Sequence, residues 1–341
     1  MAAQSALTVD SRLFKPSAAP EAANVSNKQI SAMAVGRPNW WDIGAPKYRE
    51  MAARGELILP APALLPEATD FFIPSREAGR SIPCRVVRPA GATPPAGIFM
   101  HIHGGGWVMW TEKHQDPSLK SYADATNVVA ISIGYRLAPE HPFPAAPHDC
   151  YDAAEWLIQN GVKEFGAPLK FVGGESAGGH LSMLTAQHLL THPDAKFSQY
   201  QLRGLILHFG VFDLSWTPSV LNFNRDPPYV IGLADMVHYR EAFLPDPTTN
   251  YKDPSISPLH FNFYALPEDT KLPAAYFTCG TEDLLLDDTM FMSTKWQMAG
   301  GEAIVRIVPG APHGFIGTPE GMYPGTKETK EESYQFSRDR V

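Results

Sequence analysis

Apolar and polar residues alternate along most of this chain in a pattern that predicts short strands followed by helices. After about residue 69, continuous runs of β-branched and other apolar residues, typical of buried parallel strands, are separated by turns rich in glycine and proline. We predict eight strands, at residues 71–74, 82–88, 97–103, 128–135, 170–174, 205–209, 274–279 and 303–308. No helix separates the first two strands, so we expect them to be antiparallel.

Helical periodicity appears between the strands. The helix predicted at residues 149–158 has one apolar face, formed by Cys150, Ala153, Ala154, Leu157 and Ile158. Further helices are predicted at residues 177–190 and 288–298. Strands that alternate with helices indicate an α/β fold, with a mostly parallel eight-stranded sheet and helices on both faces.

Two segments depart from this alternation. Residues 1–65 carry short, weakly amphipathic stretches, and 46–54 is the best helix among them, because a proline stands in its first turn and a glycine just past its end. Residues 215–262 are rich in Pro, Asn, Asp and aromatic side chains. We expect a catalytic domain at residues 66–341, with the N-terminal segment and the 215–262 insertion forming a lid over one end of the sheet.

The composition narrows the range of partners and compartments. The chain has 341 residues, 44% hydrophobic and 19% charged, which is typical of a globular protein. A net charge of −8 argues against nucleic acid as a partner. The three cysteines, Cys84, Cys150 and Cys279, form neither a disulfide framework nor a zinc motif. With no run approaching the ~20 apolar residues of a membrane span and no signal-peptide stretch, we expect a cytoplasmic protein.

Residues 174–178 read Gly-Glu-Ser-Ala-Gly and match the pattern G-x-S-x-G. The pattern alone is weak, and a glycine-rich turn with an ordinary serine is the alternative. Here a predicted strand comes directly before it and a predicted helix directly after it. That is the context of a nucleophile elbow, a sharp turn that exposes a serine at the carboxyl end of a strand. We therefore expect Ser176 to be a nucleophile.

A serine hydroxyl needs a base within hydrogen-bond reach, and the base needs an acid to orient it. In elbow-type hydrolases these residues follow the serine in the order Asp or Glu, then His. Asp283 and His313 come just after the last two predicted strands, and we expect them to be that acid and base. Spacing alone leaves Glu282 open as the acid and His260 as the base, although His260 falls in the lid segment.

Three glycines, Gly104, Gly105 and Gly106, follow the strand predicted at 97–103. Their backbone N–H groups, together with that of Ala177, are expected to form an oxyanion hole, because no side chain would keep a substrate oxygen away. The alternative is a phosphate-binding loop. The sequence has neither the G-K-[ST] of a P-loop nor a fitting G-x-G-x-x-G.

Two histidines before these glycines, His101 and His103, resemble the start of the metal-binding pattern H-x-H-x-D-H. Glycines occupy the places of its Asp and its last His. We therefore expect no metal and no cofactor.

The sequence resembles the hormone-sensitive-lipase-like carboxylesterases of the α/β-hydrolase fold over about residues 70–320. Five motifs follow one another in the order of that family: HGGGW at 103–107, YRLAPEHPFPAAPHD at 135–149, GGESAGGH at 173–180, GTEDLLLDD at 280–288 and PHGF at 312–315. Two positions depart from the family pattern. Glu175 stands where Asp is usual, and leucine follows Asp283 where proline is usual.

The resemblance implies the α/β-hydrolase fold with a helical cap made by the two lid segments, and it assigns roles to single residues. It implies that Ser176 is the nucleophile, His313 the general base and then the general acid, and Asp283 the partner that orients His313. It also implies that His103 supports the glycine loop and that residues 135–149 pack behind the site.

The reaction implied is a two-step acyl transfer through an acyl-enzyme. The bulky lid residues favour short-to-medium acyl chains or compact aromatic esters, so a small ester is the expected partner. Enzymes that resemble this one often form homodimers through the edge of the last strand. Candidate walls of an apolar pocket are Trp107, Trp110, Phe209, Trp216, Tyr229 and Phe315, with Trp40 and Trp41 at its entrance.

Other functions remain open at this stage. The same machinery serves amidases, deacetylases and acyltransferases, including enzymes that act on a secondary metabolite. A non-catalytic small-molecule receptor is a further alternative. Receptors that resemble this family lose the catalytic histidine, whereas His313 is present here.

Overall fold

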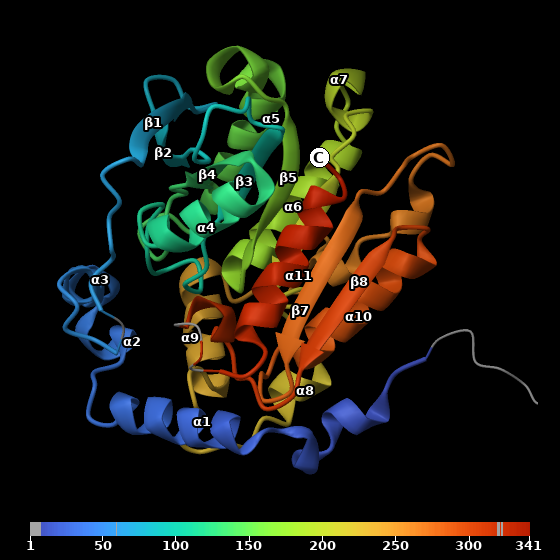
Figure 1. Ribbon diagram of the computed structural model, residues 1–341. Coiled ribbons are helices and arrows are strands. Elements are labelled where there is room, and N and C mark those ends of the chain that lie inside the picture. The colour runs from blue at the N-terminus through green and yellow to red at the C-terminus, as the bar shows by residue number, and fades with distance from the viewer. Residues whose placement is uncertain (1–7, 59, 319–320, 322) are drawn as a thin grey trace, which may run out of the picture.

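An eight-stranded sheet runs through the centre of the computed structural model, which describes residues 8–58, 60–318, 321 and 323–341 (Figure 1). Its order is β1-β2-β4-β3-β5-β6-β7-β8. The strands are β1 (Thr69–Pro74), β2 (Ser81–Val87), β3 (Gly97–Ile102), β4 (Val128–Ile133), β5 (Leu169–Glu175), β6 (Gly204–His208), β7 (Ala274–Gly280) and β8 (Ala303–Val308). All eight predicted strands are confirmed, with ends that differ by at most two residues.

The direction of the strands also matches the prediction. β2 is antiparallel to both β1 and β4, and the remaining neighbours are parallel. β3 and β4 are buried at every residue because helices cover both faces of the sheet, which explains their continuous apolar sequences.

Helices cover both faces of the sheet (Figure 1). On one face lie α4 (Asp116–Thr126) and α11 (Thr326–Arg338), which pack with Phe99, Phe171 and Tyr276 of the strands. On the other face lie α5 (Ala145–Phe165), α6 (Ala177–Leu190) and α10 (Leu286–Met298). Four of the five residues predicted on the apolar face of the 149–158 helix are completely buried: Cys150, Ala153, Ala154 and Leu157.

The predicted helices at 177–190 and 288–298 are confirmed as α6 and α10, whereas α4 and α11 were not predicted. α11 buries mainly small polar residues, among them Thr326, Thr329, Ser333 and Ser337. Hydroxyl groups of this helix bond to its own backbone, as Ser337 Oγ does to the carbonyl of Ser333 at 3.0 Å. The buried face of α11 therefore carries almost no apolar signal in the sequence.

The N-terminal segment and the 215–262 segment meet at the carboxyl end of the parallel strands (Figure 1). The rings of Trp40 and Tyr239 stack with centroids 5.4 Å apart, and those of Trp41 and His238 at 4.2 Å. The helices of these segments are α1 (Glu21–Ala34), α2 (Trp40–Ile43), α3 (Ala45–Ala53), α8 (Pro218–Leu221) and α9 (Leu233–Phe243). The helix predicted at 46–54 is confirmed as α3, whereas the longer α1 was not predicted.

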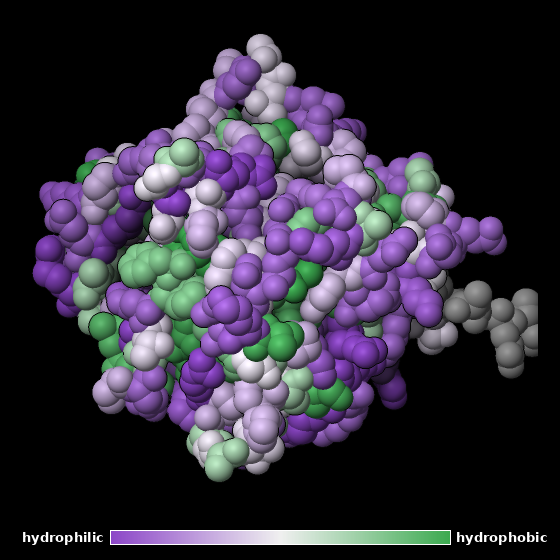
Figure 2. Space-filling model, turned by 90° about the horizontal axis from the view of Figure 1, so that it is seen from above, coloured by the Kyte–Doolittle hydropathy of each residue, from purple (hydrophilic) through white to green (hydrophobic). Residues whose placement is uncertain are grey.

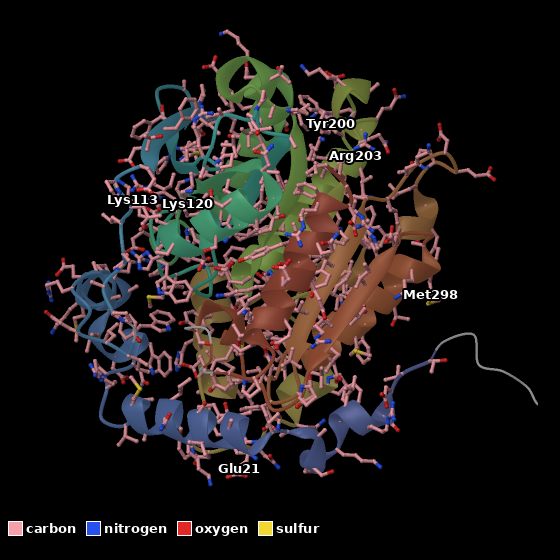
Figure 3. The ribbon with its side chains drawn as sticks, viewed as in Figure 1. Glu21, Lys113, Lys120, Tyr200, Arg203 and Met298 are labelled. Carbon is pink, nitrogen blue, oxygen red and sulfur yellow. The ribbon has the colours of Figure 1, made fainter. Side chains whose placement is uncertain are left out.

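The two ends of the molecule differ in what covers them. Figure 3 shows Glu21 of α1 at one end, with Tyr200 and Arg203 toward the other. Seen from above, the end away from α1 is mainly polar, with smaller hydrophobic areas (Figure 2). The remaining short helical turns are η1 (Ser11–Phe14), η2 (Pro16–Ala18), α7 (Ala195–Ser198), η3 (Pro258–His260), η4 (Phe263–Ala265) and η5 (Phe315–Gly317).

Among the described helices, none has the length and apolar content that crossing a membrane requires. All three cysteines are buried thiols without a disulfide bond.

A histidine on α6 is fully buried in its neutral form. The indole N–H of Trp107 donates to Nδ1 of His180 at 3.1 Å, and Nε2 of His180 lies 2.7 Å from the carbonyl of Ile256, to which it donates. A second proton on Nδ1 would face the Trp107 N–H. Burial lowers the pKa of His180 to about 4.

We predict that His180 makes the protein less stable in mild acid. An unfolded histidine has a pKa of about 6.5, so between pH 6.5 and 4 the unfolded state binds a proton that folded His180 does not. The free energy of unfolding should therefore decrease as the pH is lowered from 6.5 to 4, by about 1.4 kcal/mol per pH unit for this group. In His180→Gln, whose amide offers a donor and an acceptor but does not titrate, the free energy of urea unfolding at pH 7, 6 and 5 should depend less steeply on pH.

The exposed His141 provides the control. His141→Gln should keep the wild-type dependence on pH. Parallel curves for His180→Gln and wild type would contradict the prediction.

Candidate active site

The turn between β5 and α6 holds its serine in a strained conformation. Ser176 has φ 55° and ψ −120°, a region that costs of order 1–3 kcal/mol for a residue other than glycine. Its backbone N–H donates to the carbonyl of His208 at 2.9 Å. A Cβ atom on Gly174 or on Gly178 would lie 1.9 Å from the carbonyl oxygen of Ile102. Both glycines of G-x-S-x-G are thus required by the close approach of β3.

The three residues predicted to form a triad lie together. Ser176 Oγ is 2.9 Å from Nε2 of His313, and Nδ1 of His313 is 2.9 Å from Oδ2 of Asp283. The Asp283 side chain is completely buried, and its second oxygen accepts the backbone N–H of Leu285 at 2.9 Å. A carboxylate that accepts from Nδ1 leaves Nε2 of the imidazole to take the serine proton.

Glu282 and His260, the alternatives that the sequence left open, have other partners, and so do two further acids nearby, Asp287 and Asp288. Glu282 forms an ion pair with an arginine of the 215–262 segment. Asp287 and Asp288 accept hydrogen bonds from backbone and hydroxyl groups of the same segment. His260 lies 3.2 Å from an aspartate other than Asp283. None of the four is hydrogen-bonded to Ser176 or His313 within the described part of the chain.

The glycine loop after β3 differs from the expectation at one residue. The N–H of Gly104 donates to Oε1 of Glu175 at 2.8 Å, so it is not free for a substrate oxygen. The backbone N–H groups of Gly105, Gly106 and Ala177 make no hydrogen bond with the residues that the structure describes. An oxyanion hole at this place would therefore consist of these three donors, without Gly104.

His103 and Tyr135 hold the other side of Gly104. The Nδ1–H of His103 donates to the Gly104 carbonyl at 2.9 Å, and the Tyr135 hydroxyl lies 2.9 Å and 3.1 Å from the carbonyls of His103 and Gly104. The two rings stack with centroids 4.3 Å apart. Burial lowers the pKa of His103 to about 3 and keeps the ring neutral. This arrangement agrees with the support role that the resemblance implies for His103.

The N-terminal segment reaches the same loop from outside. The guanidinium of Arg49 on α3 donates to the carbonyls of Val108 and Ala138, both at 2.6 Å, and forms an ion pair with Glu140 at 2.9 Å. One side chain thus joins α3, the end of the glycine loop and the 135–149 segment.

Four of the six aromatic residues predicted as pocket walls are buried in the structure. Trp107 and Phe209 are each 1% exposed, and Phe315 is completely buried. Phe209 packs edge-on against the His313 ring at 4.8 Å, so it supports the histidine without offering surface to a substrate. Trp216 is 9% exposed, under the guanidinium of Arg240. A wall position remains a prediction for the partly exposed Trp110 and Tyr229.

Outside this site, Glu155, His188 and His192 are the one group among the described residues with metal-ligating atoms close together. Nε2 of His188 lies 2.7 Å from the Glu155 carboxylate. The backbone N–H of Asp194 donates to Nδ1 of His192 at 3.0 Å, so neutral His192 carries its proton on Nε2, which faces Glu155. A metal would need a lone pair on that nitrogen, whereas here its proton points toward the Glu155 carboxylate.

Comparisons with known proteins place the chain among hydrolases of this fold. The family model for the alpha/beta hydrolase fold matches residues 99–317. The chain is 31% identical to the carboxylic ester hydrolase LipN of Mycobacterium tuberculosis over 280 residues, 79% of this chain and 70% of LipN. It is 41% identical to arylacetamide deacetylase of Oryctolagus cuniculus over 123 residues, which cover 34% of this chain and 31% of that protein.

Solved structures show the same likeness. The ester-hydrolase EH1AB1 from the metagenome of Lake Arreo superposes with a TM-score of 0.77 at 26% identity, covering 94% of this chain and 98% of that one. The range that the family model matches spans more than half of the chain and contains Ser176, Asp283 and His313. This chain therefore belongs to the α/β-hydrolase-fold family, within its hormone-sensitive-lipase-like carboxylesterase group.

Proposed function

We propose that this protein is a serine carboxylesterase that acts through Ser176, His313 and Asp283. The observation that carries the proposal is the unbroken chain of two 2.9 Å hydrogen bonds from the buried Asp283 carboxylate through His313 to the serine hydroxyl. The strained turn presents that hydroxyl beside backbone N–H groups that have no partner among the described residues. A nucleophile, a base and oxyanion donors together are what acyl transfer requires.

The proposed reaction uses each part of this geometry. Ser176 Oγ attacks the ester carbonyl carbon while Nε2 of His313 takes its proton, and the Asp283 carboxylate stabilises the imidazolium. The N–H groups of Gly105, Gly106 and Ala177 bind the developing oxyanion, and one such donor typically lowers the barrier by ~2.7–4 kcal/mol. His313 then protonates the leaving alcohol, and water repeats the two steps on the acyl-enzyme.

The lid segments support a limit on substrate size. A Cβ atom on Gly106 would lie 2.4 Å from the ring of Tyr239, so α9 packs directly against the glycine loop. Trp40 of the N-terminal segment stacks on the same tyrosine. We infer that residues 1–65 and 215–262 act as a cap that favours short-to-medium acyl chains or compact aromatic esters.

The first prediction of this function concerns chain length and the nucleophile. With p-nitrophenyl esters from acetate to palmitate, turnover should peak at short or medium chains. Ser176→Ala should lower kcat more than about 10³-fold, because no other described group replaces the nucleophile.

Ser182→Ala, the same change further along α6, should keep wild-type activity, since among the described residues its hydroxyl bonds only to the Gly178 carbonyl. Faster turnover of the palmitate ester than of the butyrate ester would contradict the limit on acyl-chain length that we infer for the cap. A kcat of Ser176→Ala within about 10³-fold of wild type would contradict the assignment of Ser176 as the nucleophile.

The second prediction separates the two adjacent acids. Asp283→Asn removes the acceptor that holds the His313 tautomer, so kcat should fall about 10⁴-fold. Glu282→Gln should change kcat by no more than a few-fold, because Glu282 pairs with Arg225 and not with the histidine. Steady-state kinetics of the two variants with p-nitrophenyl butyrate provide the measurement. If Glu282→Gln lowered kcat more than Asp283→Asn did, Glu282 would be the residue that orients His313.

A further inference from the structure

We propose that Glu175 is a positioning residue of the oxyanion hole, whose carboxylate fixes Gly104 so that the next two N–H groups of the glycine loop face the substrate oxygen. This inference rests on the proposed function and adds to it a residue that touches neither substrate nor triad in the proposed mechanism. It also gives a role to one of the two positions at which this chain departs from the family pattern.

Glu175 is the last residue of β5 and directly precedes the serine. Its side chain, 11% exposed, reaches across to the loop that follows β3. Oε1 accepts the N–H of Gly104 at 2.8 Å and also a hydrogen bond from the side-chain amide of Gln115. Oε2 lies 3.0 Å from Nε2 of His101. Three groups from separate parts of the chain therefore hold one carboxylate.

A second layer fixes this carboxylate in turn. Nδ1 of His101 lies 3.0 Å from the hydroxyl of Ser132 on β4, so the imidazole bridges β4 and Glu175. Burial acts to raise the pKa of Glu175, but the attraction and hydrogen bond of His101, together with the Gly104 N–H, outweigh it and lower the pKa. The side chain is therefore an anion, which is a stronger acceptor than a neutral group.

The contact with Gly104 has a direct consequence for the loop. Because Glu175 binds the N–H of Gly104 while His103 and Tyr135 bind its carbonyl, both sides of this residue are fixed. The next residue, Gly105, has a φ of 98°, a backbone conformation that glycine adopts readily. A Cβ atom on Gly104 would lie 2.9 Å from the Glu175 carbonyl oxygen and 3.3 Å from its Cγ, so the loop rests on Glu175 itself.

The length of the Glu175 side chain allows its carboxylate to reach both Gly104 and His101. Aspartate at position 175 would be one methylene shorter, and it could not bond both Gly104 and His101 in their present places. The glycine loop would have to move toward β5, or the Gly104 bond would be lost. Glutamine has the same length as glutamate and keeps an acceptor for the Gly104 N–H. The structure thus ranks the substitutions, with glutamine the mildest, aspartate more severe and alanine the most severe.

The test compares Glu175→Gln, Glu175→Asp and Glu175→Ala in the full chain. kcat and KM are measured with p-nitrophenyl butyrate, and Ki with an alkyl trifluoromethyl ketone, whose adduct with the serine places an oxyanion in the hole. We expect Glu175→Ala to lower kcat about 100-fold, the scale of a misplacement by ~1 Å, with KM within threefold. Ki for the ketone should rise by a similar factor. Glu175→Gln should stay within about fivefold of wild type in all three constants. The constants of Glu175→Asp should lie between those of Glu175→Gln and Glu175→Ala.

Leu157→Ala serves as the control for general destabilisation. Leu157 is completely buried on α5 and is none of the residues to which the proposal gives a role. This variant should lower the Tm without changing kcat below the transition. If Glu175→Ala does not fold, the order of Glu175→Gln and Glu175→Asp still decides the matter, because a merely structural role predicts changed Tm with unchanged kcat in both.

Unchanged kcat and ketone Ki in folded Glu175→Asp and Glu175→Ala would overturn this inference and leave the proposed function standing. A rise in KM alone would overturn it as well, since it would place Glu175 in substrate binding. Wild-type protein that hydrolyses no ester, and so does not differ from Ser176→Ala, would overturn the proposed function and this inference with it.

Discussion

The close approach of two backbone segments is the constraint on which the rest of the site depends. The turn after β5 lies so near the end of β3 that Gly174 and Gly178 would each bring a Cβ to 1.9 Å from the Ile102 carbonyl. Since β3 and β5 are paired parallel neighbours, their carboxyl ends meet at one edge of the sheet. The serine turn and the glycine loop are therefore adjacent through backbone geometry, and side chains only adjust how they face each other.

Much of this arrangement could be predicted from the sequence, because it depends on residues that are local or in a fixed order. β3 and β4 are buried on both faces, so their sequences are continuously apolar. Asp283 and His313 could be found since each follows a strand. α11 and α1 could not be predicted, because their buried faces consist largely of Thr, Ser, Ala and Asn. The bond between Glu175 and Gly104 joins residues 71 positions apart, and no local pattern indicates it.

The aromatic residues near the motifs show a different limit of sequence reasoning. Proximity to a motif does not determine which way a ring points when the backbone adopts an unusual conformation. Positive φ angles, uncommon outside glycine, occur at Ser176 and at four of the six predicted wall residues, namely Trp107, Trp110, Phe209 and Trp216. Such residues cost of order 1–3 kcal/mol each and persist only where packing enforces them. Trp107 has such packing, because its ring stacks on that of Phe243 with centroids 4.6 Å apart.

The hydrogen bonds around the glycine loop divide its residues into two kinds. Gly104 has its N–H bound by Glu175 and its carbonyl bound by His103 and Tyr135, so it has no free donor for a ligand. Gly105 and Gly106 have N–H groups without a partner among the described residues. Unpaired donors in a partly buried place are unfavourable until an acceptor arrives. In the proposed reaction the oxyanion would be such an acceptor, and the bonds to Gly104 would keep the donors from relaxing toward other partners before it forms.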